Sequence, residues 1–199
     1  MDPRAVAGAK ERLDQAREAV TGLHKPTTFS QTRRDWLAFL IAANGVYQKL
    51  EKGAKTYHKS REWYRKLKEL RKTDELLRYV YRARNAEEHG LDPSVQFNAP
   101  KLEIANRNSK VAPENKGKQI VIHTNEDKEK DDPRRPSFRV TLPDKLHLVT
   151  VKDDRFGDEF PVPSYHLGKK LESGPIAAVC DMVIEFLDAA IKEASALPK

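Results

Sequence analysis

A continuous apolar stripe near the C-terminus constrains the fold of this chain more than any other sequence feature. From residue 176 to residue 194, apolar side chains recur every three or four positions, the spacing of one face of an α-helix. The stripe consists of Ile176, Val179, Cys180, Val183, Leu187, Ala190, Ile191 and Ala194. A helix with such a face must bury it against other secondary structure. We expect its partners to be the helices at the other end of the chain.

The first ninety residues supply those partners, because their apolar side chains recur at helical spacing in three stretches. The first begins at Asp2-Pro3, an N-cap followed by a first-turn proline, and the second begins at about Ser30. The third runs from about Ser60 to His89, with a bend expected near Lys72-Thr73. Together with the last helix, these stretches predict a mainly α (α+β) fold built on a four-helix bundle.

The stretch between the helices, residues 91–170, has a different pattern. It holds most of the twelve prolines of the chain, and its apolar residues form short runs typical of β-strands. We expect strands near 102–105, 119–124, 137–142, 145–152 and 159–162. The sequence therefore predicts a single domain, residues 1–199. Residues 1–90 and 171–199 form the helical bundle, and 91–170 form a β-rich insertion with a small antiparallel sheet before the last helix.

Charge and composition narrow the range of partners. The chain has 199 residues, with 37 Lys and Arg against 30 Asp and Glu, and the net charge of +7 favours anionic partners such as nucleic acid.

A single cysteine excludes an internal disulfide and a thiolate zinc site. The longest mostly apolar run, residues 36–46, is about half the length needed to cross a bilayer, and the N-terminus lacks the apolar segment of a signal peptide. We expect a cytoplasmic protein with no membrane segment.

No familiar metal or cofactor motif occurs in the sequence. Glycine-rich phosphate loops, nucleophile elbows and zinc-finger spacings are missing. Four scattered histidines, His58, His123, His147 and His166, show no spacing typical of metal ligands. We therefore expect neither a metal nor a cofactor.

A cation interrupts the apolar stripe of the third helical stretch. Leu77 and Tyr81 continue that stripe, and the next residue in the row is Arg84. Arginine is seldom buried unless it is paired, so its place in the stripe needs an explanation. Asn85 and His89 lie four residues apart on one helix edge beside it. Arg84 and His89 are about 140° apart around an ideal helix, so they converge only if His89 lies in the last turn or the helix loosens before its end.

The segment YVYRARNAEEHG, residues 79–90, resembles the signature of the HEPN superfamily (higher eukaryotes and prokaryotes nucleotide-binding). That signature is an arginine, a polar residue directly after it and a histidine a few positions further on, which Arg84, Asn85 and His89 match. The resemblance implies a small helical bundle, usually a homodimer. It also implies a metal-independent endoribonuclease of the kind found in toxin–antitoxin, phage-defence and RNA-processing systems, with an antitoxin protein as an expected partner. It covers residues 3–90 and 173–197.

The chemistry that these residues allow is specific. RNA carries its own nucleophile, the ribose 2′-OH, so cleavage needs a proton acceptor, a proton donor and positive charge against the phosphorane. We assign acid–base catalysis to His89, the phosphate and transition-state clamp to Arg84, and an orienting role to Asn85. One motif offers one histidine, so a two-fold dimer would supply the second.

Alternative interpretations remain open for the same residues. Arg84 and His89 also suit the negative end of a helix dipole. The helix end could bind nucleotide, RNA or a partner protein without catalysis, or it could tie helices together in a structural homo-oligomer.

The basic residues before the motif also have two interpretations. We take Arg61, Arg65, Lys68, Arg71 and Lys72 as candidate nucleic-acid-binding residues. The alternative is an ordinary solvated helix face. The tyrosines among them could stack on bases, but their helical spacing favours core packing.

Overall fold

The computed structural model describes residues 1–25, 28–90, 93–97, 101–106, 119–122, 136–141, 146–153, 157–172 and 174–197. Within these residues the fold is mainly helical, with five helices and small antiparallel strand pairs. The mainly α (α+β) class is therefore confirmed. The chain divides into two compact units, residues 1–96 with 148–199 and residues 97–147. The second unit is narrower than the expected insertion, because 148–170 belong with the helices.

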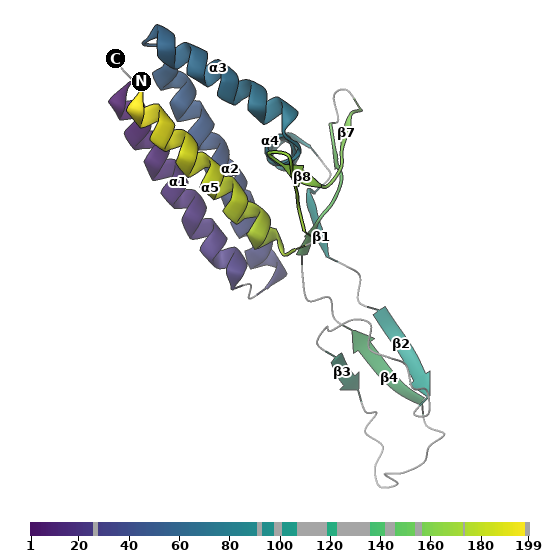
Figure 1. Ribbon diagram of the computed structural model, residues 1–199. Helices are drawn as coiled ribbons and strands as arrows, with labels where there is room; N and C mark the ends of the chain where they lie inside the picture. Colours follow the sequence, from purple (N-terminus) through teal and green to yellow (C-terminus); the bar gives the residue numbers. More distant parts are fainter. Residues whose placement is uncertain are drawn as a thin grey trace. The chain divides into compact units, whose positions relative to one another are not determined.

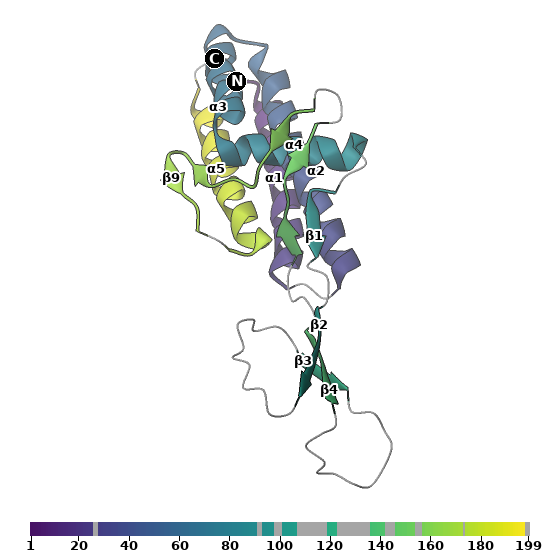
Figure 2. The ribbon, with the colours of Figure 1, turned by 90° about the vertical axis from the view of Figure 1, so that its right-hand side faces the viewer.

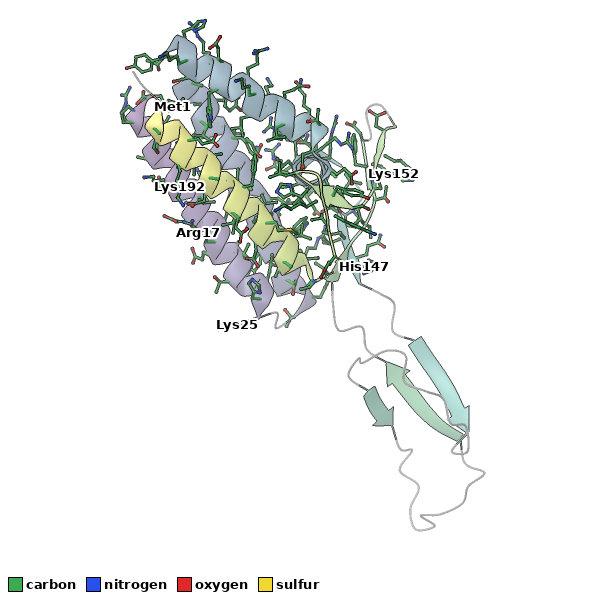
Figure 3. The ribbon with its side chains drawn as sticks, in the orientation of Figure 1. Met1, Arg17, Lys25, His147, Lys152 and Lys192 are labelled. Atoms are coloured by element: carbon green, nitrogen blue, oxygen red, sulfur yellow. The ribbon has the colours of Figure 1, made fainter. Side chains whose placement is uncertain are left out.

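Three long helices lie side by side in the first unit, namely α1 (Pro3–His24), α2 (Phe29–Ala54) and α5 (Ile176–Ala196) (Figures 1 and 2). The expected stripe of α5 is buried except for the half-buried Val179, and its Cys180, Val183 and Leu187 are at most 1% exposed. An ion pair of 2.9 Å between Arg17 of α1 and Asp188 of α5 lies at the edge of this contact (Figure 3). The apolar stripe therefore meets the N-terminal helices, as the sequence predicts. None of the described helices is both long and apolar enough to span a membrane.

The predicted third helix is two helices, so the expected continuous helix with a bend is wrong. α3 (His58–Thr73) ends at Asp74, whose backbone is extended, and α4 (Glu75–His89) begins directly after it. The Asp74 carboxylate accepts a hydrogen bond of 2.9 Å from the Leu77 amide and so caps α4. An aspartate competes for backbone donors in this way and favours a helix start over a helix interior. The apolar spacing continues across the break, which is why periodicity alone misses it.

The strands form four separate groups. In residues 97–147, β2 (Lys101–Asn106), β4 (Pro136–Thr141) and β3 (Gln119–Ile122) form an antiparallel sheet with β4 in the centre. β1 (Val95–Phe97) pairs with β5 (Leu146–Leu148). Two antiparallel pairs follow, β6 (Val151–Lys152) with β7 (Glu159–Phe160) and β8 (Tyr165–His166) with β9 (Lys169–Lys170).

The expected strands agree with these in part. The predicted strand 145–152 is split into β5, which pairs with β1, and β6, which pairs with β7. β1, β8 and β9 have no counterpart among the predicted strands. The predicted strand ends at Thr124 and Leu142 lie outside the described residues.

Asp74 also holds the β8–β9 hairpin against the start of α4. Its carboxylate accepts from the Leu167 amide at 2.7 Å and lies 3.0 Å from Nδ1 of His166. Leu167 has a left-handed φ of 49°, which is uncommon for a branched residue and is held by this bond. Burial would raise the pKa of the Asp74 carboxyl. Hydrogen bonds from Leu167, Leu77 and His166 outweigh that effect and lower the pKa below its usual value.

A glycine sets the close approach of α1 and α2. A Cβ added at Gly53 would lie 2.3 Å from the Cβ of Ala5, which is fixed to the α1 backbone. We expect Gly53→Ala to destabilise the fold by about 1–3 kcal/mol in urea unfolding, because the helices must separate. The matched control is Gly8→Ala, whose Cβ would meet only the flexible Lys49 side chain. It should be neutral or stabilising by up to about 1 kcal/mol. Equal stability of the two variants would contradict the packing described here.

Asp74 predicts a pH-dependent loss of stability. A carboxyl with a lowered folded-state pKa stabilises the fold above its unfolded pKa of about 4, and that contribution is lost as the pH falls through the folded value. Asp74→Asn should cost about 1–3 kcal/mol at pH 6, and the difference from wild type should shrink as the pH falls below about 4. Urea unfolding at several pH values measures this, with the exposed Asp14→Asn as control. A difference independent of pH would show that the Asp74 charge is unimportant.

Candidate functional site

α4 places the predicted motif at the end of a buried helix. Leu76, Leu77 and Ala83 anchor α4 in the core, each at most 2% exposed. The helix ends at His89, and the Gly90 amide caps it with a 2.8 Å hydrogen bond to the Ala86 carbonyl. His89 therefore lies in the last turn of α4, where the predicted third stretch also ends, and Gly90 follows at the C-cap.

Arg84 is engaged within its own helix. Its guanidinium donates to Oδ1 of Asn85 at 3.1 Å and forms an ion pair with Glu88. The side chain is 20% exposed, and its Nε is buried with no hydrogen-bond partner among the described residues. The pairing explains how a cation is tolerated in the continuation of a core stripe.

Asn85 and His89 line an open groove of about 530 Å³. Tyr81 and Arg82 also line the α4 side of the groove, and the β6–β7 pair lines the other side with Lys152 and Phe160. The His89 side chain is 73% exposed and its Nε2 lies 3.8 Å from Glu88. This volume is within the usual range for ligand sites of roughly 300–1,000 Å³. The structure thus brings Asn85 and His89 together beside a space that a ligand can enter.

The arginine that lines this groove is Arg82, not Arg84. Arg82 ion-pairs with Asp153, and its guanidinium carbon lies 4.5 Å from the centre of the Phe160 ring. Sequence reasoning missed Arg82, although its position three residues before Asn85 and seven before His89 places it on their helix face. It also missed Phe160, because no local pattern indicates that β7 folds back onto α4.

The two glutamates of the motif have different roles. Glu88 pairs with Arg84, whereas Glu87 points into the protein and is 3% exposed. One Glu87 oxygen accepts 2.8 Å hydrogen bonds from both the amide and the hydroxyl of Ser94. The buried Trp36 indole donates to the same Ser94 hydroxyl at 2.8 Å. Glu87 is therefore a structural residue that fixes the chain after α4.

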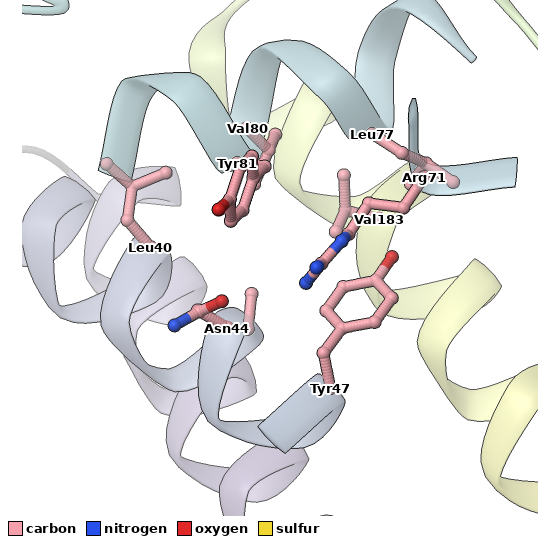
Figure 4. Close-up of a pocket in the computed structure, with 9 residues that line it drawn as sticks. Leu40, Asn44, Tyr47, Arg71, Leu77, Val80, Tyr81 and Val183 are labelled. Carbon is pink, nitrogen blue, oxygen red and sulfur yellow. The ribbon is translucent and has the colours of Figure 1, made fainter. Parts of the chain in front are cut away.

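The predicted nucleic-acid-binding residues lie in different surroundings. Arg61 and Arg65 are exposed on α3. Lys68 lies 3.9 Å from Glu51 and Lys72 lies 3.5 Å from Glu69. Arg71 is the exception, because its guanidinium lies between two tyrosine rings. The distances to their centres are 4.6 Å for Tyr47 and 4.5 Å for Tyr81 (Figure 4). The structure does not gather all five cations at one place.

The described residues contain no group of three His, Cys, Asp or Glu side chains that could hold a metal ion. No protein-family model, curated protein or solved structure matches this chain.

The two neighbouring glutamates of the motif provide a direct test of the site. Glu87→Ala should destabilise the protein by about 2–4 kcal/mol, because it leaves two buried donors of Ser94 without an acceptor. Glu88→Ala removes a partly exposed ion pair and should cost at most about 1 kcal/mol. Urea unfolding of both variants measures the contrast. A larger loss for Glu88→Ala would reverse the roles assigned to the two residues.

Proposed function

We propose that this protein is a metal-independent endoribonuclease with a HEPN-like bundle, and that it acts as a homodimer. The observation that carries the proposal is the open groove lined by Asn85 and His89, with the Arg84 guanidinium bonded to Asn85 at the same helix end. These are the three residues in which the chain resembles the HEPN signature.

The residue types at this groove match the needs of RNA cleavage. His89 is exposed, and an imidazole is the side chain most often used as a general acid or base. It takes the proton of the ribose 2′-OH, the 2′-oxygen attacks phosphorus, and the 5′-oxygen leaves with a proton from the histidine of a second copy. The products are a 2′,3′-cyclic phosphate and a 5′-OH. DNA is spared because it lacks the 2′-OH.

Arg84 supplies the charge in this proposal. Its guanidinium can hold two phosphate oxygens, and the phosphate then takes the place of Glu88 as its anionic partner. Asn85 connects the phosphate contact of Arg84 with the proton transfer of His89. Its Oδ1 accepts a hydrogen bond from Arg84, and its side chain lines the groove together with His89.

A second function is favoured by one observation. The Arg84 guanidinium is neutralised by Glu88 within the same chain, which suits a module that binds RNA or nucleotide at the groove without cleaving it. Under this alternative His89 and Asn85 contact the ligand, and Arg84 only stiffens the helix end.

Cleavage of labelled RNA in the presence of EDTA separates the two functions. We expect wild type to release cyclic-phosphate products, and His89→Ala and Arg84→Ala each to lose at least about 100-fold in rate. His58→Ala is the matched control, because that histidine is 75% exposed on another helix and should retain full activity. Binding of RNA without cleavage by wild type would establish the second function instead. Equal cleavage by wild type and His89→Ala would indicate a contaminant and overturn the enzyme proposal.

A further inference from the structure

Three arginines and three aromatic rings alternate along one side of the helical unit. We call this set the arginine–aromatic ladder, and its order is Tyr47, Arg71, Tyr81, Arg82, Phe160 and Arg78. Each successive guanidinium carbon lies between 4.5 and 6.0 Å from the next ring centre, within the range of cation–π contact. The members come from α2, α3, α4 and β7, so only the tertiary fold creates the ladder.

Two of the ladder arginines have no ion-pair partner among the described residues. Neither Arg71 nor Arg78 forms an ion pair with any described carboxylate, whereas Arg82 pairs with Asp153. An aromatic face orients a guanidinium without cancelling its formal charge. Arg71 and Arg78 are therefore cations held in place in advance, so binding an anion costs them little side-chain entropy.

The ladder is continuous with the groove. The Tyr81 ring contacts Arg71, and Tyr81 also lines the groove together with Asn85 and His89. Figure 4 shows the Arg71 guanidinium between the rings of Tyr47 and Tyr81, with its end toward Asn44. The cavity there has only about 10 Å³, room for a single water. An enclosed small molecule does not fit, so an anion must approach Arg71 from the solvent side.

We propose that the arginine–aromatic ladder is a phosphate-binding track that holds an RNA strand beside the groove. Arg71 and Arg78 each bind a backbone phosphate, and Arg82 positions the groove wall through Asp153 and Phe160. This inference rests on the proposed function, because the RNA strand bound by the track is the strand that enters the groove at His89. Spaced, oriented cations interleaved with rings suit a nucleic-acid backbone, since phosphates repeat along it at regular intervals.

The test measures RNA binding in a His89→Ala background, so that cleavage does not affect the measurement. The probe is a labelled single-stranded RNA of about 20 nucleotides, titrated at several salt concentrations. Arg71→Gln and Arg78→Gln should each weaken binding and lower the slope of log K against log salt by about 0.7. The matched control is Arg12→Gln on α1. This arginine also lacks a described carboxylate partner, donates to Gln15 and has no aromatic contact among the described residues. Its substitution should leave the slope unchanged.

Arg71→Lys distinguishes charge from packing, because lysine keeps the positive charge but loses the planar stack. It should retain the wild-type salt slope, and circular dichroism should show that all variants remain folded. A slope lost in Arg71→Lys as fully as in Arg71→Gln would overturn the track. Unchanged RNA binding by Arg71→Gln and Arg78→Gln would also overturn the track, whether or not His89→Ala abolishes cleavage. If it does abolish cleavage, the proposed ribonuclease would stand and only the track would fall. If the parent His89→Ala protein binds no RNA, the track falls, and if wild type binds none either, the RNA function falls with it.

Discussion

The Glu87 carboxylate holds the chain where it leaves α4, and the candidate site depends on this contact. Glu87 fixes Ser94 through two hydrogen bonds, and the Ser94 carbonyl in turn accepts from the Val149 amide at 3.1 Å. The buried Tyr79 hydroxyl donates to the Val149 carbonyl at 2.7 Å. These hydrogen bonds join Ser94, shortly before the chain leaves the helical unit, to Val149, directly after the chain returns to it. Because the chain returns at this place, β6 and β7 pack beside α4 and form the second wall of the groove.

Helical geometry divides the five polar and charged motif residues among three environments. A rotation of about 100° per residue puts Arg84 and Glu88 on one line, Asn85 and His89 on the next, and Glu87 toward the core. Arg84 and Glu88 form an ion pair, and Asn85 and His89 line the groove. The buried Glu87 carboxylate accepts a hydrogen bond from the Ser94 hydroxyl. The same short segment therefore terminates the helix, neutralises a cation and presents an imidazole to solvent. A catalytic use of Arg84 requires a phosphate that binds it better than Glu88 does.

The basic residues illustrate the limits of reading function from composition. Five cations near the motif look equivalent in the sequence, yet Lys68 and Lys72 lie near carboxylates while Arg71 lies between two rings. Arg78 and Arg82 were not singled out, although their guanidiniums lie over a ring that arrives some eighty residues later. Charge along a chain is a local property, whereas the partner that cancels or orients that charge is brought by folding.

Helix positions and the motif followed from the sequence alone, because periodic apolar residues and capping residues act over a few neighbours. The burial of the stripe on α5, the start of α1 after Asp2 and the end of α4 at Gly90 belong to this group. The break at Asp74 was missed because the apolar spacing continues across it, and the hairpin that the Asp74 carboxylate also binds begins about ninety residues later. Likewise, the groove and the ladder needed the tertiary structure, since Phe160 reaches α4 only through the fixed return of the chain at Val149. The spacing of residues along the chain determines which of them share a helix face. Which residues that face contacts is determined only by long-range packing.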